Sequence, residues 1–292
     1  MIIGIDGNEA NVERRVGISE YAFELLAQFA KFEVRSSKFE VYLKDQPRVD
    51  LPKEREGWRY RIVGPRKLWT QIGLPLDLYL HKPRPDVFFS PTHYAPRFSP
   101  VPTVISIMDL SYIHYPDMFK TSDLYQLRNW TAYSVNNAKR VFTISTASKD
   151  DIIRVYNVPS EKVVVTYPGI KMQKAKVKSQ KSVLEKYGID GEYIIFVGTL
   201  QPRKNVSRLI EAFAKLTPRS LSLVVVGKKG WLYEEILEAP KKLGVEDRVK
   251  FLDFVPDEDL PSLYTNARCF VLPSLMRDLG CQCLRQCNTD VL

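Results

Sequence analysis

Short runs of β-branched and aromatic residues alternate along this chain with longer segments in which apolar residues recur at helical spacing. The runs are too short for helices and apolar throughout, which is typical of strands covered on both faces. The clearest helical segment carries Ile18, Tyr21, Ala22, Leu25 and Phe29 on one face. We expect strands at 1–6, 39–43, 59–63, 86–90, 101–107, 140–144 and 162–166, and others beginning at 193, 221, 249 and 269.

This alternation predicts an α/β fold built from doubly wound parallel sheets. The stretch 171–181 has almost no apolar content and is expected to cross between two domains. We therefore predict a first domain over 1–170, a linker over 171–182 and a second domain over 183–292, which opens with a helix near 183–187. The length of 292 residues and the hydrophobic content of 45% suffice for two cores.

The chain is basic, with 43 Lys and Arg against 34 Asp and Glu and a formal net charge of +9 at pH 7. This balance favours an anionic partner, namely a phosphorylated substrate, a membrane face or a nucleic acid. Nucleic acid is the weakest of the three, because there is no arginine-rich arm and no zinc-finger spacing. No apolar stretch approaches the roughly 20 residues of a membrane span, and the first ten residues, MIIGIDGNEA, are too short and too acidic to be expected to act as a signal peptide. We expect a soluble cytoplasmic protein, with peripheral contact at the inner face of a membrane left open.

The most informative turn follows the apolar run 193–197. Gly198 is expected to let the backbone turn there, and Arg203 and Lys204 stand just before the next helix. Adjacent cations beside a helix N-terminus, where backbone amides are unpaired, form a site for a phosphate or diphosphate. An isolated Arg-Lys pair would be read as a solvated loop pair, but the surrounding sequence favours the anion site.

That surrounding sequence carries a family resemblance. The segments GTLQPRKNVSRLIEAF, VVVGKKGW and DFVPDEDLPSLYTNARCFVLPS closely resemble, in this order, the group 1 or family 4 glycosyltransferases, and they cover most of the second half of the chain. The resemblance implies two facing Rossmann-like domains, called GT-B, with a nucleoside diphosphate sugar between them. It also implies retention of anomeric configuration without a bound metal or other cofactor. On this resemblance Arg203 and Lys204 neutralise the donor diphosphate, and Gly198 and Thr199 belong to the same donor-binding turn.

The first half offers weaker candidates for site residues. Gly17 precedes the first helix, where the family uses a glycine close to the donor phosphate or the acceptor; a simple turn glycine is the alternative. His93 follows a predicted strand and is a candidate on the acceptor side, or else a packed loop histidine. Asp109 matches a family block that usually reads HDL, and either holds a substrate hydroxyl or caps the next turn. Met108 replaces the histidine of that block, which leaves the identity of the sugar open.

The end of the chain departs from the family. After Leu275 the family continues with a glycine-rich turn and a helix bearing two donor-site glutamates, whereas this chain reads MRDLGCQCLRQCNTDVL. Cys281, Cys283 and Cys287 have poor spacing for zinc, so we expect no metal site and no function for them. With suitable codons, a shift of one base converts this stretch into SLYEGFGLPVFEAMQYGCP, which contains the missing motif. We therefore expect 276–292 to be an out-of-frame tail, the second domain to be incomplete, and the chain as written to be inactive.

The function expected of the parent protein is transfer of a hexose, such as mannose, from a nucleoside diphosphate sugar to a lipid-linked or polysaccharide acceptor. A sugar-nucleotide epimerase of the same architecture is one alternative. A non-catalytic fragment that binds an anion or a membrane is another, because Arg66 and Lys67 precede Trp69 in a basic and aromatic segment. We expect that segment instead to begin an ordinary helix whose packed face carries Ile72, Leu76 and Leu80.

Overall fold

The computed structural model describes residues 1–15, 17–31, 37–169, 180–216 and 220–275. These residues form two compact units. The first unit comprises Met1–His114 and Thr121–Pro168, and the second comprises Tyr115–Lys120 and the chain from Gly169 onward. Most of the predicted linker lies outside the described residues, and the first helix of the second unit, α6 (Gln180–Lys186), begins three residues before the predicted start at 183.

The first unit contains a sheet of seven strands in the order β3-β2-β1-β4-β5-β6-β7, and every neighbouring pair is parallel. The order reverses between β1 and β4, so this is a doubly wound sheet of the predicted kind. The strands are β1 (Ile2–Asp6), β2 (Lys38–Leu43), β3 (Trp58–Ile62), β4 (Val87–Ser90), β5 (Thr103–Ile107), β6 (Arg140–Thr143) and β7 (Val163–Val165).

Helices cover both faces of this sheet because successive strand residues point to opposite sides. Val41 packs in the core beneath α1 (Ile18–Lys31), while its neighbour Tyr42 packs in the core beneath α2 (Leu74–Leu80). The other helical segments of the first unit are the π-helical turn η1 (Trp69–Gly73), α3 (Ser111–His114), α4 (Thr121–Asn137), α5 (Thr146–Tyr156) and η3 (Ser160–Lys162). The short helix η2 (Pro116–Met118) lies in the stretch Tyr115–Lys120, which belongs to the second unit.

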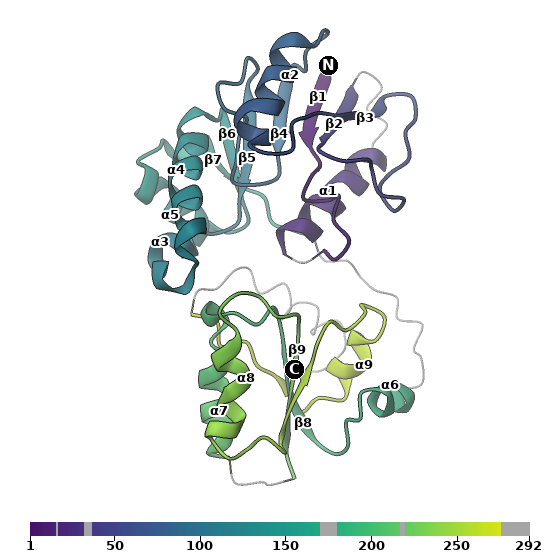
Figure 1. Cartoon of the computed structure of the whole chain (residues 1–292), viewed down its shortest axis with the longest axis vertical. Helices are drawn as coiled ribbons and strands as arrows, with labels where there is room; N and C mark the ends of the chain where they lie inside the picture. Colours follow the sequence, from purple (N-terminus) through teal and green to yellow (C-terminus); the bar gives the residue numbers. More distant parts are fainter. Residues whose placement is uncertain (16, 32–36, 170–179, 217–219, 276–292) are drawn as a thin grey trace. The chain divides into compact units, whose positions relative to one another are not determined.

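The second unit contains a smaller parallel sheet of four strands in the order β10-β9-β8-β11. Figure 1 shows α7 and α8 on one side of this sheet and α6 and α9 on the other, and each side has its own apolar core. The elements are β8 (Tyr193–Val197), η4 (Pro202–Lys204), α7 (Val206–Ala214), β9 (Ser222–Val226), α8 (Glu234–Lys242), β10 (Val249–Leu252), α9 (Leu260–Thr265) and β11 (Cys269–Phe270).

The predicted packing of the segment after Trp69 is wrong. Ile72, Leu76 and Leu80 are 49%, 53% and 72% exposed, while Trp69 is 2% exposed and lies in the core. The reason is the π-helical turn η1, which contains one more residue than an α-helical turn and so rotates the following side chains about the axis. Leu74, Pro75 and Leu78 are the residues of α2 that face inward.

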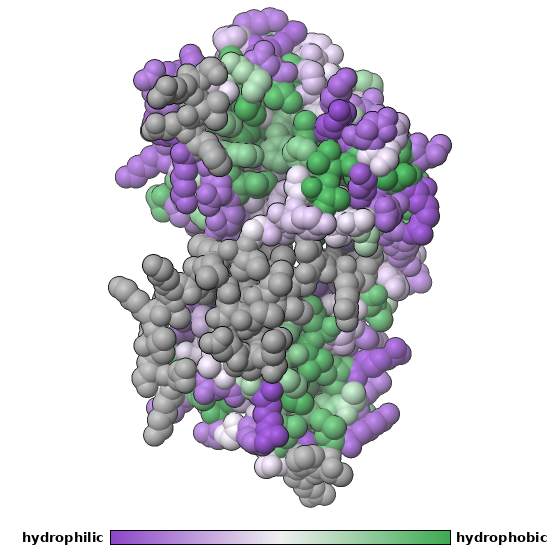
Figure 2. Space-filling model, turned by 180° about the vertical axis from the view of Figure 1, so that it is seen from behind, coloured by the Kyte–Doolittle hydropathy of each residue, from purple (hydrophilic) through white to green (hydrophobic). Residues whose placement is uncertain are grey.

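Apolar residues also reach the surface elsewhere, and Figure 2 shows them in green among hydrophilic residues in purple on both units. Single exposed apolar side chains are normal on a soluble fold. The exposed residues of η1 and α2 differ because they recur on successive helical turns. Within the part of the chain that the structure describes, no helix is both long and apolar enough to cross a membrane.

Candidate functional site

Three loops come together at the carboxyl edge of the second sheet. They are residues 198–205 after β8, 227–233 after β9 and 271–275 after β11. The strand order reverses between β8 and β11, because β9 and β10 follow on one side of β8 and β11 lies on the other. Ligands of open α/β sheets bind at such a reversal, beside the carboxyl ends of the strands.

The loops after β8 and β9 lie backbone against backbone. Leu200 N donates to Lys228 O at 2.9 Å, and Gly230 N donates to Leu200 O at 2.9 Å. Gly227 has φ +148°, and a Cβ at this position would lie 1.9 Å from Gly198 O. Only glycine fits there, and this close approach fixes Lys228 and Lys229 beside the turn after β8.

Arg203 and Lys204 lie in the short helix η4, one turn before α7. Lys204 is 7% exposed and Arg203 is half-buried. The carbonyl of Arg203 accepts a hydrogen bond from Leu275 N at 3.0 Å, and Asn205 Nδ2 donates to Pro273 O at 3.2 Å, so the loop after β11 holds this turn in place. Asn205 occupies the N-cap position of α7 with φ 58°. The loop after β11 thus holds Arg203 and Lys204 in their position just before α7.

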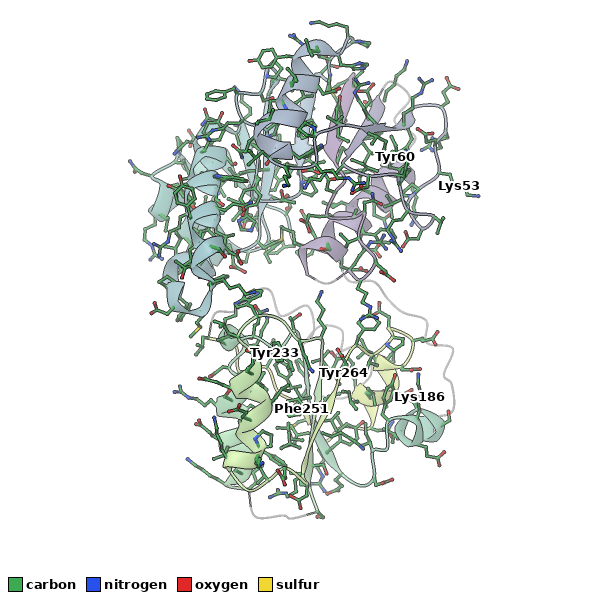
Figure 3. The ribbon with its side chains drawn as sticks, viewed as in Figure 1. Lys53, Tyr60, Lys186, Tyr233, Phe251 and Tyr264 are labelled. Carbon is green, nitrogen blue, oxygen red and sulfur yellow. The ribbon has the colours of Figure 1, made fainter. Side chains whose placement is uncertain are left out.

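The two loops after β8 and β9 present cations and contain no acidic residue. Their cations are Arg203, Lys204, Lys228 and Lys229. The Lys229 ammonium lies 5.6 Å from the ring centre of Tyr233, which precedes α8 and is labelled in Figure 3. This arrangement suits a ligand with more than one negative charge.

Sequence reasoning missed three residues of this site: Gln201, Lys228 and Lys229. Gln201 is 4% exposed, and its Oε1 has no hydrogen-bond partner among the described residues. Buried polar atoms are normally hydrogen-bonded, so this oxygen is available to a donor group of a ligand. The signal for Lys228 and Lys229 in the sequence was that this pair of cations follows, after Gly227, the apolar run that forms β9.

Gly198 and Thr199 lie in the same turn, but the reason expected for Gly198 is corrected. Positive φ is found at Asn205 and Gly227 and not at Gly198. A Cβ at Gly198 would instead come within 3.1 Å of the Phe196 ring, so packing favours glycine there. The Thr199 methyl group lies against Gly230, where a Cβ would come within 2.9 Å of it.

His93 and Asp109 follow the neighbouring strands β4 and β5 of the first unit, and the structure brings them close enough to interact electrostatically. Burial lowers the pKa of the His93 imidazole, and the negative charge of Asp109 opposes that shift. The Nδ1 atom of His93 is buried with no hydrogen-bond partner among the described residues. Asp109 Oδ1 accepts from Ser111 N at 2.8 Å, so this carboxylate also caps the turn that leads into α3.

Gly17 lies on a different loop, between β1 and α1. Its φ is +56°, and no atom lies within 4 Å of the position that a Cβ would take. Its carbonyl accepts the amide of Tyr21 at 3.0 Å, as expected at the start of a helix. The left-handed backbone conformation favours glycine at this position, whereas crowding by neighbouring atoms does not. Met108 contributes its carbonyl, which accepts from Ser148 Oγ at 2.9 Å.

Within the described ranges, no group of three or more His, Cys, Asp and Glu side chains is arranged to hold a metal ion. Cys269 is exposed and free. Cys281, Cys283 and Cys287, and the whole predicted out-of-frame tail, lie outside the described residues.

Comparison with known protein families agrees with the fold and with the motifs. The family described as Glycosyltransferase Family 4 matches residues 17–174, which is more than half of the chain, and the family described as Glycosyl transferases group 1 matches residues 179–284. The chain therefore belongs to the family 4, or group 1, glycosyltransferases. Its two parallel-sheet units are those of the GT-B fold.

Individual relatives are similar at modest identity. The O-antigen chain mannosyltransferase B of Escherichia coli is 28% identical over 238 residues, which is 80% of this chain and 60% of that protein. The O-antigen chain mannosyltransferase RfbU of Salmonella typhimurium is 29% identical over 176 residues, which is 60% of this chain and 46% of that protein. The aligned region thus spans 60% or less of the length of these relatives.

Solved structures share the fold. Anabaena Alr3699/HepE in complex with UDP-glucose has a TM-score of 0.73 and 19% identity, and the match covers 99% of this chain and 78% of that one. WaaG, a glycosyltransferase involved in lipopolysaccharide biosynthesis, has a TM-score of 0.71 and 18% identity, with 100% of this chain and 80% of that one covered.

Proposed function

We propose that this chain belongs to an enzyme that transfers a hexose, specifically mannose, from a nucleoside diphosphate sugar to a lipid-linked or polysaccharide acceptor, with retention of anomeric configuration. The observation that carries the proposal is the meeting of Arg203, Lys204, Lys228 and Lys229 at the strand reversal of the second sheet. The similarity to mannosyltransferases of O-antigen chains supports the choice of sugar and acceptor. Membrane association follows from a lipid-linked acceptor.

In this proposal the diphosphate binds to Arg203 and Lys204. When the bond between the sugar and the diphosphate breaks, negative charge grows on the departing phosphate oxygen, and fixed cations stabilise that charge. Lys228 and Lys229 add to the positive potential from the neighbouring loop. Gly198 and Thr199 lie in the turn that contacts the donor, and the buried Oε1 of Gln201 accepts a donor group of the nucleotide sugar. These cations do the work that a divalent metal does in other transferases.

Retention follows if the acceptor hydroxyl attacks the face of the sugar from which the diphosphate departs. The new bond joins the acceptor oxygen to the anomeric carbon, the bond to the diphosphate breaks, and the acceptor proton passes to a departing phosphate oxygen. His93 and Asp109 serve the sugar and acceptor in the first unit. A neutral imidazole both donates and accepts hydrogen bonds, as recognition of a sugar hydroxyl requires. Gly17, on the loop between β1 and α1, contacts the donor in this proposal.

The test of the donor site is the affinity of the purified chain for UDP, GDP and their sugars, measured by isothermal titration calorimetry. R203A and K204A should each weaken binding about 10- to 100-fold, since a hydrogen bond to a charged group contributes about 1.5–3 kcal/mol. R208A is the matched control, because Arg208 is an exposed cation on the adjacent helix α7. Equal affinity in R203A, K204A and the wild-type chain would remove the diphosphate assignment.

Transfer itself requires, in our proposal, the glutamate-bearing motif that a one-base shift after Leu275 would restore. This expectation rests on the sequence alone, because residues 276–292 lie outside the described residues. The measurement is donor turnover by the chain as written and by a frame-restored chain, each with acceptor and with donor alone. Transfer by the chain as written would contradict it, and conversion of the donor to an epimer without acceptor would identify an epimerase.

A further inference from the structure

The second unit contains one segment whose neighbours in the sequence belong to the first unit. Residues 115–120, which we call the η2 segment, lie between α3 and α4 of the first unit in the sequence but pack with the second unit. Met118 N donates to Tyr115 O at 3.1 Å, and Phe119 N donates to Pro116 O at 3.0 Å. These bonds shape the turn without attaching it to another element, so contacts with the rest of the second unit must hold it in place.

Trp231, in the loop after β9, makes one of these contacts. Its Nε1 donates to Met118 O at 2.6 Å, and its ring lies against the Phe119 ring, with ring centres 5.4 Å apart and planes inclined by 35°. A partly buried indole is fixed in direction by its single N–H group and in position by its ring. Trp231 is therefore held against the η2 segment in one orientation.

The loop that carries Trp231 also carries two cations of the candidate site. Gly230 N, just after these lysines, donates to Leu200 O at 2.9 Å, and Trp231 follows directly. Leu232 then has φ 52°, a left-handed conformation that is uncommon for a leucine, although its side chain is 46% exposed. Burial of this side chain does not explain the conformation, so the contacts of its neighbours must impose it. The contacts of Gly230 and Trp231 thus fix the loop on the C-terminal side of its two lysines.

Tyr115 joins the η2 segment to a second loop of the site. Its hydroxyl donates to Leu275 O at 3.3 Å, and Leu275 N donates to Arg203 O at 3.0 Å. Leu275 therefore links the η2 segment to the turn that carries Arg203 and Lys204. A single segment thus contacts both the loop after β9, which carries two cations, and the loop after β11, which holds the other two in position.

We propose that the η2 segment, through Trp231 and Tyr115, positions the cations of the candidate site, and that a nucleoside diphosphate bound to them stabilises the segment in return. Cations that are held in place bind an anion more tightly than mobile ones, because less side-chain and loop freedom is lost on binding. The return effect is required by linkage, since two equilibria that affect each other do so by the same factor. This inference rests on the proposed function for the identity of the ligand.

Trp231 and Tyr115 are positioning residues in this proposal, because they act through the cations and not by touching the reacting atoms. The residues on either side of the η2 segment, His114 and Thr121, belong to the first unit. A nucleotide bound in the second unit therefore acts on a segment that lies within the sequence of the first.

The first test is the affinity of the whole chain for UDP and GDP, measured by isothermal titration calorimetry. W231F keeps a ring for Phe119 but has no N–H group for Met118 O, and it should bind about two- to tenfold more weakly than the wild-type chain. W231A loses both contacts, and its binding should be weaker by about tenfold or more. W130F is the matched control and should bind as the wild-type chain does, because Trp130 is a partly buried tryptophan of α4 in the first unit.

A comparison of double variants separates positioning from a general effect on the fold. In the K228A/K229A background, W231A should weaken binding by less than about twofold, because the groups through which Trp231 acts are already absent. Y115F should weaken binding in the wild-type background and have no effect in the R203A background. Equal losses from W231A with and without the two lysines would overturn the positioning role, as would equal affinity in W231F, W231A and W130F.

Hydrogen exchange read by mass spectrometry tests the return effect and requires no transfer activity. UDP or GDP should slow exchange at 115–120 by about threefold or more in the wild-type chain and not in W231A. Without nucleotide, W231A should exchange faster than W130F both at 115–120 and at 227–230. Unchanged exchange at both segments in W231A would overturn the inference whatever the ligand, whereas a wild-type chain that binds neither UDP nor GDP would overturn the proposed function.

Discussion

Arg61 and Asp77 form a two-pronged ion pair, with Nε 2.7 Å from Oδ2 and Nη2 2.7 Å from Oδ1. The pair joins β3 to α2, and the hydrogen bonds to Asp77 raise the pKa of Arg61. Two parallel hydrogen bonds between a guanidinium and a carboxylate fix direction as well as distance. This contact therefore fixes α2 against β3, while Leu74 and Leu78 of the same helix face the core.

We expect D77N to lower the free energy of unfolding of the first unit by about 1–2 kcal/mol, because one charge-assisted contact is lost at a partly buried position. Denaturant unfolding measures this effect. E246Q, at an exposed acidic residue of the second unit, is the control, and a D77N chain as stable as E246Q would contradict the role given to the pair.

The close approach of two loops in the candidate site gives a sharper prediction. G227A places a Cβ 1.9 Å from Gly198 O at a φ of +148°, so the loops after β8 and β9 must separate. We expect a loss of roughly 3 kcal/mol or more in stability and weakened binding of nucleotide sugars. G244A is the matched control, because Gly244 has φ +64° with no atom within 4 Å of its Cβ position, and should cost only about 1 kcal/mol.

A G227A chain that binds nucleotide sugars as tightly as G244A would show that Lys228 and Lys229 need not stand beside the turn after β8. Binding should be measured at a temperature where both variants are folded, as checked by circular dichroism. That control separates loss of the site from loss of the fold.

Much of the architecture is predictable from the sequence because each central strand is an apolar run that no amphipathic helix would contain. Both sheets and the parallel order agree with the expected doubly wound fold. A boundary error has a simple cause: the predicted strand at 101–107 begins at Thr103, since Pro102 has no amide hydrogen to give to the ladder. The buried face of α2 was not predictable, because its register depends on the π-helical turn η1.

The sequence likewise identified some residues of the candidate site and missed others. Arg203 and Lys204 were identifiable because they lie in one continuous motif after β8. Gln201 was missed because its burial depends on the three loops that meet around it. Lys228 and Lys229 were missed because their position beside that turn comes from the pairing of β8 with β9 and from two glycines that allow close backbone contact. A linear pattern does not reveal such a meeting of distant residues.

The second unit depends on a buried carboxylate. Asp259 is fully buried, and its Oδ2 accepts from Lys186 Nζ at 2.6 Å and from Tyr187 OH at 2.9 Å. These bonds join α6 to the start of α9, and Figure 3 labels Lys186 on α6. We expect D259A to lower the unfolding free energy by about 1–3 kcal/mol, because both donors lose their acceptor.

The control for D259A is E238Q. Glu238 pairs with Lys242 on the exposed side of α8, where such a pair contributes little. Thermal unfolding of the two variants should separate them clearly, with E238Q near the wild-type midpoint. A D259A chain that melts with E238Q would mean that α6 is held by its apolar contacts alone.

Asp6 gives a prediction about pH. Burial raises the pKa of this carboxyl to about 6 from 3.8, although Asn8 N and Asn8 Nδ2 donate to its Oδ1 at 3.0 and 2.7 Å. The folded state therefore holds a proton between about pH 4 and pH 6 that the unfolded state has lost. Asp6 therefore favours folding below about pH 4, and this contribution to stability disappears as pH rises through 6. The difference amounts to about 3 kcal/mol at most.

We expect D6N to remove the fall in the free energy of unfolding that Asp6 causes between pH 4 and pH 6. The stability of D6N relative to the wild-type chain should increase between pH 4 and pH 6 and then stay constant up to pH 8, because the amide does not titrate. Urea unfolding at several pH values measures the difference, and D190N, at an exposed aspartate, should follow the wild-type curve throughout. A constant gap between D6N and wild type across the whole range would show that Asp6 titrates alike in the folded and unfolded chain, and that the hydrogen bonds from Asn8 offset its burial.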